Sequence, residues 1–326
     1  MKPAPAPRPA PKLVSFIFPV FNEEEGLPFL RSSLNDWLAH FPHSVEIILI
    51  DDGSGDSSYR LIQEWAAADA RVRGISFSRN FGHQMAVSAG LSLAQGDAVV
   101  IMDADLQDPL EVVPEMISRY CEGYDVVYGQ RAEREGETKF KLATAWLFYR
   151  LMRRFVHKDL PEDTGDFRLI SRRCLDAILQ MNEQHRFLRG MFAWVGFWQT
   201  AVRYKRNARK FGETKYPLRK MVVLAWNAAL SFSTLPIKLI SVGGFCTAVL
   251  ACLYGGYAIV QKYVFNNTVP GWTGLVVILG IIGGMILISL GVIGEYVGRI
   301  FEEIKRRPLY IVRDDTRANT TSNESR

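Results

Sequence analysis

The chain has 326 residues, 48% of them hydrophobic and 22% charged, with a formal net charge of +5. This length allows one or two domains with a sizeable core. The positive charge is too small and too scattered to indicate a nucleic-acid-binding protein, so we expect no nucleic-acid partner. The cysteines show no metal or redox spacing and are expected to be reduced structural thiols: Cys121, Cys174, Cys246 and Cys252.

The first segment, residues 1–12, alternates proline and alanine and contains three basic residues. This composition predicts a disordered, Pro-rich tail. It has no apolar run of the kind found in signal peptides, so nothing here would export the domain that follows.

Strand and helix patterns alternate strictly over residues 13–130, which predicts a parallel sheet with crossover helices. The expected strands cover residues 14–20, 45–50, 72–77, 98–102 and 125–128. The expected helices cover residues 24–40, 56–68, 83–95 and 110–121.

The most informative stretch is residues 98–109, AVVIMDADLQDP, an apolar run that stops on Asp103 and Asp105. These aspartates fall at the carboxyl end of a predicted buried strand, where ligands bind in open parallel sheets. Two carboxylates at this spacing can share a divalent cation that also binds substrate phosphates. The alternative is an ordinary capped turn before a helix.

Other strand ends also carry polar residues. Asn22 and Glu23 follow the first strand, and Asp51 and Asp52 follow the second. Carboxylates at successive strand ends converge on one crevice, which packing alone does not explain.

Taken together, the motifs FPVFNEE, ILIDDGSGDSS, FSRNFGHQMAVSAG and DADLQDP resemble those of the inverting family 2 glycosyltransferases with the GT-A fold. The stretches TGDFRLISR, HRFLRGM and RKFGETKY resemble more narrowly the polyprenyl-phosphate glycosyltransferases of the bactoprenol glucosyltransferase type, which are related to dolichyl-phosphate mannose synthase. The resemblance covers residues 13–313. It implies an α/β GT-A catalytic domain over residues 13–216, with a mostly parallel Rossmann-like sheet.

The resemblance also implies a donor site. Pro19, Phe21 and Glu23 would contact the base and ribose, and Asp51, rather than Asp52, is the first choice to accept a hydrogen bond from the base. Asp103 and Asp105 would hold Mg²⁺ or Mn²⁺ on the donor diphosphate. The complete predicted donor set is Pro19, Phe21, Glu23, Asp51, Asp52, Arg79, Asp103, Ala104, Gln107, Arg186 and Lys215.

The predicted catalytic residues are Asp166 and Asp105. Asp166 lies in what reads as a short Gly turn at residues 164–168, and the resemblance makes it a base or a group that orients the acceptor. Because a phosphate monoester is already anionic, it needs positioning more than deprotonation, so Asp166 could instead orient the sugar. His83 is a lone histidine and reads as polar lining of the site.

Basic residues follow Asp166. Arg186 would pair with the donor diphosphate. Processive polysaccharide synthases carry Gln-x-x-Arg-Trp near this position, and its absence here argues for single transfer. Arg206, Arg209 and Lys215 are predicted to close over the donor and lipid phosphates, the alternative being contact with anionic lipid headgroups.

The remaining patterns indicate a membrane protein. Residues 138–158 and 217–234 read as interfacial amphipathic helices. For residues 138–158 the pattern alone fits a helix packed within the domain about as well, and the nearby spans favour the membrane. Uncharged runs at 239–260 and 269–294, within residues 235–298, are long enough to span a bilayer. Basic flanks place the catalytic domain and the C-terminal tail, residues 299–326, in the cytoplasm. The spacing of Gly280 and Gly284 is typical of helix association, so we expect a homo-oligomer, although ordinary glycine content explains it equally well.

We therefore expect a multi-pass enzyme of the cell membrane. It would transfer glucose from UDP-glucose, with inversion, to undecaprenyl phosphate. Two alternatives remain open. One is the same reaction with a mannosyl or modified arabinosyl donor, and the other is a non-catalytic nucleotide-binding scaffold in the membrane.

Overall fold

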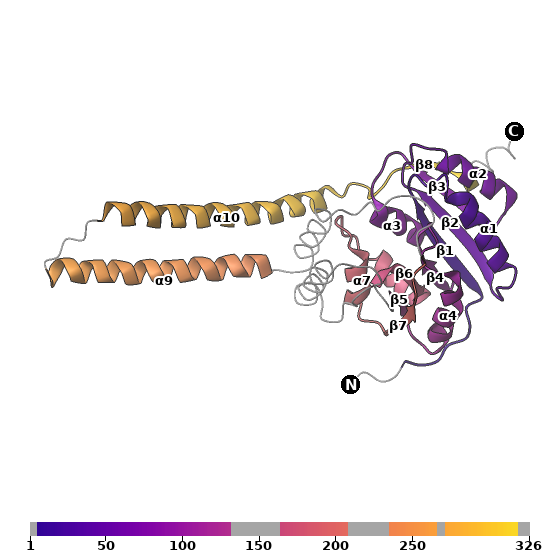
Figure 1. The fold of residues 1–326 in the computed structure, drawn as a ribbon, viewed down its shortest axis with the longest axis horizontal. Helices are drawn as coiled ribbons and strands as arrows, with labels where there is room; N and C mark the ends of the chain where they lie inside the picture. Colours follow the sequence, from indigo (N-terminus) through magenta and orange to yellow (C-terminus); the bar gives the residue numbers. More distant parts are fainter. Residues whose placement is uncertain (1–4, 132–163, 208–234, 266–270, 319–326) are drawn as a thin grey trace. The chain divides into compact units, whose positions relative to one another are not determined.

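The computed structural model describes residues 5–131, 164–207, 235–265 and 271–318. The chain forms two compact units, one of Met1–Lys220 with Pro308–Arg326 and the other of Met221–Arg307. The interfacial helices predicted at 138–158 and 217–234 lie outside the described residues. The first unit contains the sheet and the second contains two long helices (Figure 1).

The first unit begins with the predicted alternation of strands and helices. Its elements are β1 (Leu13–Val20), α1 (Leu27–Leu38), β2 (Ser44–Asp51), α2 (Ser58–Ala68), β3 (Val72–Phe77), α3 (His83–Leu93), β4 (Ala98–Ile101), η1 (Leu110–Val112), α4 (Val113–Cys121), β5 (Val126–Arg131), β6 (Thr164–Ser171), α6 (Arg172–Leu179), α7 (Leu188–Trp194), β7 (Gln199–Tyr204) and β8 (Val312–Asp315). The four predicted helices are therefore confirmed, with ends shifted by a few residues.

The described strands form one mixed sheet in the order β7-β5-β6-β4-β1-β2-β3-β8. Strands β4, β1, β2 and β3 are parallel neighbours, and β5 pairs in parallel with β7. Among these described strands, only β6 and β8 run against the common direction. The predicted mostly parallel α/β sheet is confirmed.

One prediction about this sheet is wrong. Residues 164–168 form the start of strand β6 rather than a Gly turn, and β6 lies between β4 and β5. Phe167 and Leu169 are buried in the core, whereas Thr164, Gly165 and Asp166 give the strand a polar start. Those polar residues hide the two-residue period of a strand from sequence reasoning. Asp166 is therefore held by a sheet.

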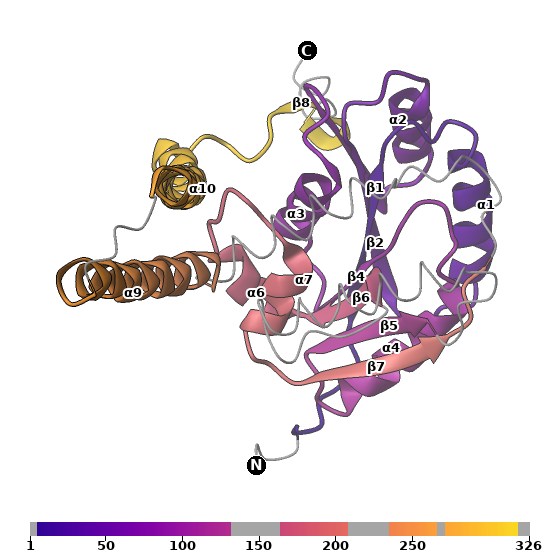
Figure 2. The same ribbon diagram turned by 60° about the vertical axis from the view of Figure 1, so that its left-hand side comes forward.

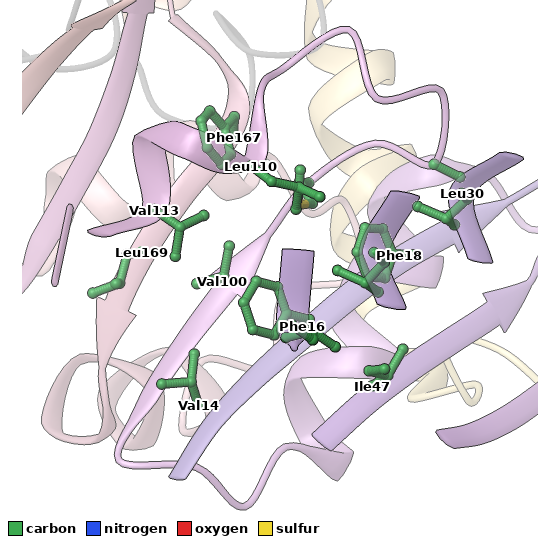
Figure 3. Packing of buried hydrophobic residues seen from close by; sticks show 14 of the residues in the cluster. Val14, Phe16, Phe18, Leu30, Ile47, Val100, Leu110, Val113, Phe167 and Leu169 are labelled. Atoms are coloured by element: carbon green, nitrogen blue, oxygen red, sulfur yellow. The ribbon is translucent and has the colours of Figure 1, made fainter. Parts of the chain in front are cut away.

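Helices cover both faces of the sheet, with α3 on one side and α1 and α2 on the other (Figure 2). The alternating side chains of β1 separate the two faces. Phe16 and Phe18 pack with Leu30 of α1 and Val100 of β4 in the core cluster shown in Figure 3. Ile17 points to the α3 side. Its Cγ2 would lie 2.3 Å from a Cβ at Gly90, so only glycine lets α3 approach this closely.

The N-terminal segment is also more ordered than predicted over residues 5–12. The Arg8 N–H donates to the Cys121 carbonyl (2.8 Å), and its guanidinium contacts Asp125 (3.0 Å) and stacks over Tyr120. A single arginine among prolines therefore fixes the segment against α4 and the start of β5, a contact that composition alone does not reveal.

The C-terminal segment corrects a third expectation. Part of the tail predicted at 299–326 forms strand β8, which pairs antiparallel with β3. The sequence VRDD is polar and short, which is typical of an edge strand and gives little signal in the sequence. The catalytic unit is thus completed by residues that follow the last long helix.

The second unit consists of α9 (Leu235–Tyr263) and α10 (Trp272–Lys305). Both are long and apolar enough to cross a membrane, and neither apolar window is buried within the protein. They touch where the Thr247 hydroxyl contacts the Met285 sulfur (3.1 Å). Helix α10 runs past the predicted end at residue 294, where Arg299 pairs with Glu295 one turn earlier (3.2 Å) and supports its continuation.

Candidate active site

The loops that follow β2 and β3 are joined by Asp52. Its carboxylate accepts the N–H groups of Phe81 (2.7 Å) and Gly82 (2.9 Å). Burial raises the pKa of Asp52, although both hydrogen bonds oppose this effect. Gly53 (φ +69°) packs so closely that a Cβ would lie 2.4 Å from the carbonyl carbon of Arg79. Asp52 therefore shapes the crevice from inside.

The loops that follow β1 and β2 are joined in the same way. The Asn22 N–H donates to the Ser54 hydroxyl (2.9 Å), and the Asn22 side-chain oxygen accepts the Gly55 N–H (2.9 Å). The Glu23 N–H donates to the hydroxyl of Ser58 (2.9 Å). Hydrogen bonds thus join the loops that follow three neighbouring strands, where the sequence predicts a crevice.

The predicted base-binding carboxylate, Asp51, is fully buried. One carboxylate oxygen accepts the Ser54 N–H (3.0 Å) and the other accepts the Ser76 hydroxyl (2.7 Å). Its position beneath the loops follows from its place as the last residue of β2. In this structure Asp51 supports the wall of the crevice.

Two predicted donor residues are accessible. Phe21 is 37% exposed, and an aromatic ring of this kind can cover a base. Arg79 is exposed, and its guanidinium lies 4.0 Å from the ring centre of Phe81. Pro19 and Glu23 are half-buried at the same strand end.

The aspartate pair lies on a tight turn after β4. Ala104 between the two carboxylates is buried, and Leu106 adopts a positive φ of 48°. The Gln107 N–H donates to Asp105 (3.1 Å). A cavity of about 210 Å³ beside Asp105 is lined by Phe29, Ser33, Trp37, Asp105, Leu106, Pro109, Leu110, Glu111 and Asn207.

Strand β6 brings Asp166 to this turn. Strands β4 and β6 are antiparallel, and Ile101 pairs with Arg168. If the register is continued by two residues, Asp103 lies opposite Asp166. His83, at the start of α3, lies between them. Its Nε2 is 3.2 Å from Asp166 and 3.8 Å from Asp103.

The charges of this cluster are coupled. Burial lowers the pKa of His83, but the adjacent carboxylates of Asp166 (3.2 Å) and Asp103 outweigh burial and raise the pKa to about 9. Burial would raise the pKa of Asp166, but Arg189 and His83 hold it well below its usual range. Burial raises the pKa of Asp103, as do the neighbouring carboxylates, although His83 opposes them. These effects favour a protonated His83 between the two carboxylates.

Arg189 is a site residue that sequence reasoning missed. Its Nε donates to Asp166 (2.8 Å), opposite the oxygen that faces His83. The Gln84 side chain accepts the Leu188 N–H (3.0 Å) and so ties α7 to α3. Arg186 and Arg189 lie in one basic run, and the start of α7 at Leu188 decides which of them meets Asp166.

Other predicted basic residues are placed differently. Arg186 is half-buried and donates to the Met181 carbonyl (2.7 Å). Arg206 lies 3.5 Å from the buried carboxylate of Asp108. Arg209 and Lys215 lie outside the described residues.

The donor set fits a hard divalent cation. Within the described residues there is no group of three or more His, Cys, Asp or Glu side chains arranged to hold a metal. Asp103 and Asp105 would supply two carboxylates and leave positions for phosphate oxygens, as Mg²⁺ sites commonly do. The side chain of Asp103 is 39% exposed within a cluster of carboxylates, which favours a cation there.

Residues 15–179 match the family described as "Glycosyl transferase family 2". Since the match covers half of the chain and includes the crevice and the Asp103–Asp105 turn, the chain belongs to this family and is a glycosyltransferase.

Relatives extend the similarity beyond the family domain. A glycosyltransferase of Bacillus subtilis, YkcC, is 46% identical over 91% of this chain and 92% of its own length. The bactoprenol glucosyl transferase of Shigella phage SfII is 39% identical over 94% of this chain and 99% of its own. A solved structure of glucosyl-3-phosphoglycerate synthase from Mycobacterium tuberculosis with Mn²⁺, UDP and product is 21% identical, covering 67% of this chain and 78% of that one, with a TM-score of 0.45.

Proposed function

We propose that this enzyme transfers glucose from UDP-glucose to undecaprenyl phosphate, with inversion, at the cytoplasmic face of the cell membrane. The observation that carries the proposal is the cluster of Asp166, His83 and Arg189 level with the Asp103–Asp105 turn. Similarity to bactoprenol glucosyl transferases over nearly the whole chain supports the lipid acceptor.

In this proposal the crevice binds the nucleotide. Phe21 covers the base, and the Asp103–Asp105 turn faces the diphosphate. A bound Mg²⁺ or Mn²⁺ would offset the charge that develops on the departing diphosphate. The turn supplies carboxylate oxygens, the ligands that these cations prefer.

Transfer needs one bond to form and one to break. An oxygen of the lipid phosphate attacks the anomeric carbon from the face opposite the nucleotide, and the bond from that carbon to the diphosphate oxygen breaks, so UDP leaves with the electron pair. Asp166 orients the reactants in this proposal, because both of its oxygens already face the cations Arg189 and His83. An anionic phosphate acceptor needs no strong base.

Helices α9 and α10 support a membrane location. Each contains an apolar window with no part buried in the protein. The charge pattern supports the cytoplasmic orientation of the catalytic unit, because Lys262 is the one charged residue of the stretch 261–271, at the end of α9 and before α10, whereas residues 299–313 are rich in basic side chains. In α10, a methyl group added at Gly280 or Gly284 would meet no atom of the described residues within 4 Å, which leaves room for a second copy in a homo-oligomer.

The test is sugar transfer by the detergent-purified protein to undecaprenyl phosphate. UDP-glucose and mannosyl and arabinosyl nucleotides are compared with and without Mg²⁺ or Mn²⁺. We expect metal-dependent labelled lipid from UDP-glucose, lost in Asp105→Ala and retained in Asp176→Asn, an exposed control on α6. A product from another donor alone would replace glucose in the proposal. Absence of any lipid product despite nucleotide binding would favour the scaffold alternative.

A further inference from the structure

Strand β8 is anchored to the catalytic unit at several points. Its backbone pairs with β3, and the Ser78 N–H donates to the Ile311 carbonyl (2.9 Å). The Tyr310 ring stacks on Phe77, with centroids 4.8 Å apart. The Arg73 guanidinium donates two hydrogen bonds to the Asp315 carboxylate (2.7 and 3.3 Å). These contacts fix β8 as part of the folded unit.

Arg313 occupies an irregular position in this pairing. Ser76 is opposite Asp314 and Phe77 is opposite Val312, so Arg313 is the extra residue of a bulge. Bulges redirect a side chain and are frequent beside active sites. Here the guanidinium of Arg313 turns to the hydroxyl of Ser76, with its Nη2 donating over 2.9 Å.

A chain of hydrogen bonds leads from this arginine to the crevice. Arg313 has only donors, so the Ser76 oxygen accepts from it and gives its single proton to Asp51 (2.7 Å). The other oxygen of Asp51 accepts the Ser54 N–H, and the Ser54 hydroxyl accepts the Asn22 N–H. This chain of hydrogen bonds from Arg313 to Asn22, which we call the relay, ends beside Phe21, the exposed aromatic residue of the donor site.

The two central residues of the relay, Ser76 and Asp51, are buried, so the hydrogen bonds between its members matter for the stability of this region. Ser76 and Asp51 both have no exposed surface. A buried carboxylate is costly unless hydrogen bonds and a nearby cation compensate it. Arg313 provides a cation one hydrogen bond away, from a strand that follows the last long helix in the sequence.

We propose that Arg313 is a positioning residue for the donor nucleotide, acting through Ser76 and Asp51 on the loops after β1 and β2, two of the three loops of the nucleotide crevice. The inference rests on the proposed function, since it assumes that the crevice binds a nucleoside diphosphate. It adds that the affinity of the crevice depends on the docked C-terminal strand.

The competing explanation is that β8 only protects the edge of the sheet. Asp315 offers a matched comparison, because Asp315→Asn weakens the anchoring pair with Arg73 but leaves the relay untouched. Arg60→Gln, on the exposed side of α2, is the neutral control.

The experiment measures UDP binding by calorimetry and amide hydrogen exchange on the full-length, detergent-purified protein. Arg313→Gln is expected to weaken UDP binding about tenfold, equal to about 1.4 kcal/mol, and to speed exchange at Ser54 while exchange at Ser78 stays unchanged. Arg313→Lys, which keeps a charged donor, should recover most of the affinity. Asp315→Asn should speed exchange at Ser78 and change UDP affinity less than twofold.

The outcomes separate the two proposals. If the unmodified protein binds UDP and Arg313→Gln matches it in affinity and in Ser54 exchange, the positioning role is wrong and the proposed function stands. If Asp315→Asn and Arg313→Gln lose affinity equally, edge protection explains both and the relay is overturned. If the unmodified protein binds no nucleoside diphosphate, both the proposed function and this inference fail.

Discussion

The two sides of the crevice are built in different ways. On the nucleotide side, the loops after β1, β2 and β3 are tied by side-chain oxygens that accept backbone N–H groups, as Asp52 does from Phe81 and Gly82. On the side formed by β4 and β6, charged side chains meet one another, as Asp166 meets His83 and Arg189. We therefore expect the first side to keep its shape and the second to exchange its ionic partners when substrate binds. Four substitutions test this contrast.

The largest effect is expected from Asp166→Asn. The amide keeps the shape but loses the charge that pairs with His83 and Arg189, so we expect kcat to fall about 10²–10³-fold. Steady-state transfer assays on the folded variant measure this, with thermal unfolding as the check on folding. Asp176→Asn serves as the exposed control. Activity within threefold of the unmodified enzyme would remove Asp166 from the reacting centre.

Asp52→Asn tests the fixed side. An amide retains one acceptor and turns a donor toward the backbone N–H groups, so the free energy of unfolding should fall by about 2–3 kcal/mol and the KM for donor should rise. Denaturant unfolding and donor titration measure the two effects. Asp69→Asn, at a partly exposed pair with Arg71, should cost less than about 1 kcal/mol. Equal losses of unfolding free energy in the two variants would mean that the hydrogen bonds of Asp52 do not hold the nucleotide side in shape.

His83→Gln tests whether the second side can exchange partners. Glutamine can still donate to Asp166 but carries no charge, so we expect about a tenfold loss in kcat, or about 1.4 kcal/mol, with little change in stability. His40→Gln, exposed after α1, is the control. A loss as large as that of Asp166→Asn would make His83 a reacting group.

The smallest effect concerns Asp125, which precedes β5 and lies beside Ser171, at the other end of β6 from Asp166. It is buried and accepts from Arg8, Ser171 and Arg173. Burial would raise the pKa of Asp125, but these partners outweigh it and lower the pKa. A carboxyl with a depressed folded pKa stabilises the protein above its unfolded value, about pH 4, and the stabilisation is lost as pH falls through the folded value.

Asp125→Asn should therefore cost about 1–2 kcal/mol at pH 7, and the difference from the unmodified protein should shrink below about pH 4. Denaturant unfolding at pH 7 and pH 3.5 measures it. Asp36→Asn, on the exposed face of α1, should show no pH-dependent difference. A constant gap at both pH values would mean that the carboxylate charge is not what stabilises this site.

The contrast between the two sides of the crevice also explains which parts of the fold and the site could be predicted from the sequence. The parallel half of the sheet was predictable because the apolar runs of β1 to β4 end on polar residues within a few positions. The positions of β6 and β5 in the sheet were not predictable, because β6 pairs with residues some 70 positions earlier. The nucleotide side depends on short-range loops, whose chemistry is visible in the local sequence.

The second side escaped prediction for a related reason. His83 shows no ligand spacing because its partners, Asp103 and Asp166, come from β4 and β6. The sequence does not distinguish Arg189 from Arg186 as the partner of Asp166. The distinction depends on where α7 begins, which the structure shows to be Leu188. Strand β8 was missed because its polar residues resemble a solvated tail.

The position of β8 in the chain also has a consequence for biosynthesis. Its pairing partner β3 ends at Phe77, about 235 residues before Val312. At about 5–20 residues per second, the ribosome needs about 10–50 s to cover that distance. Throughout this time the outer edge of β3 is unpaired while two apolar helices emerge. The catalytic sheet can therefore reach its final form only after both helices have been synthesised.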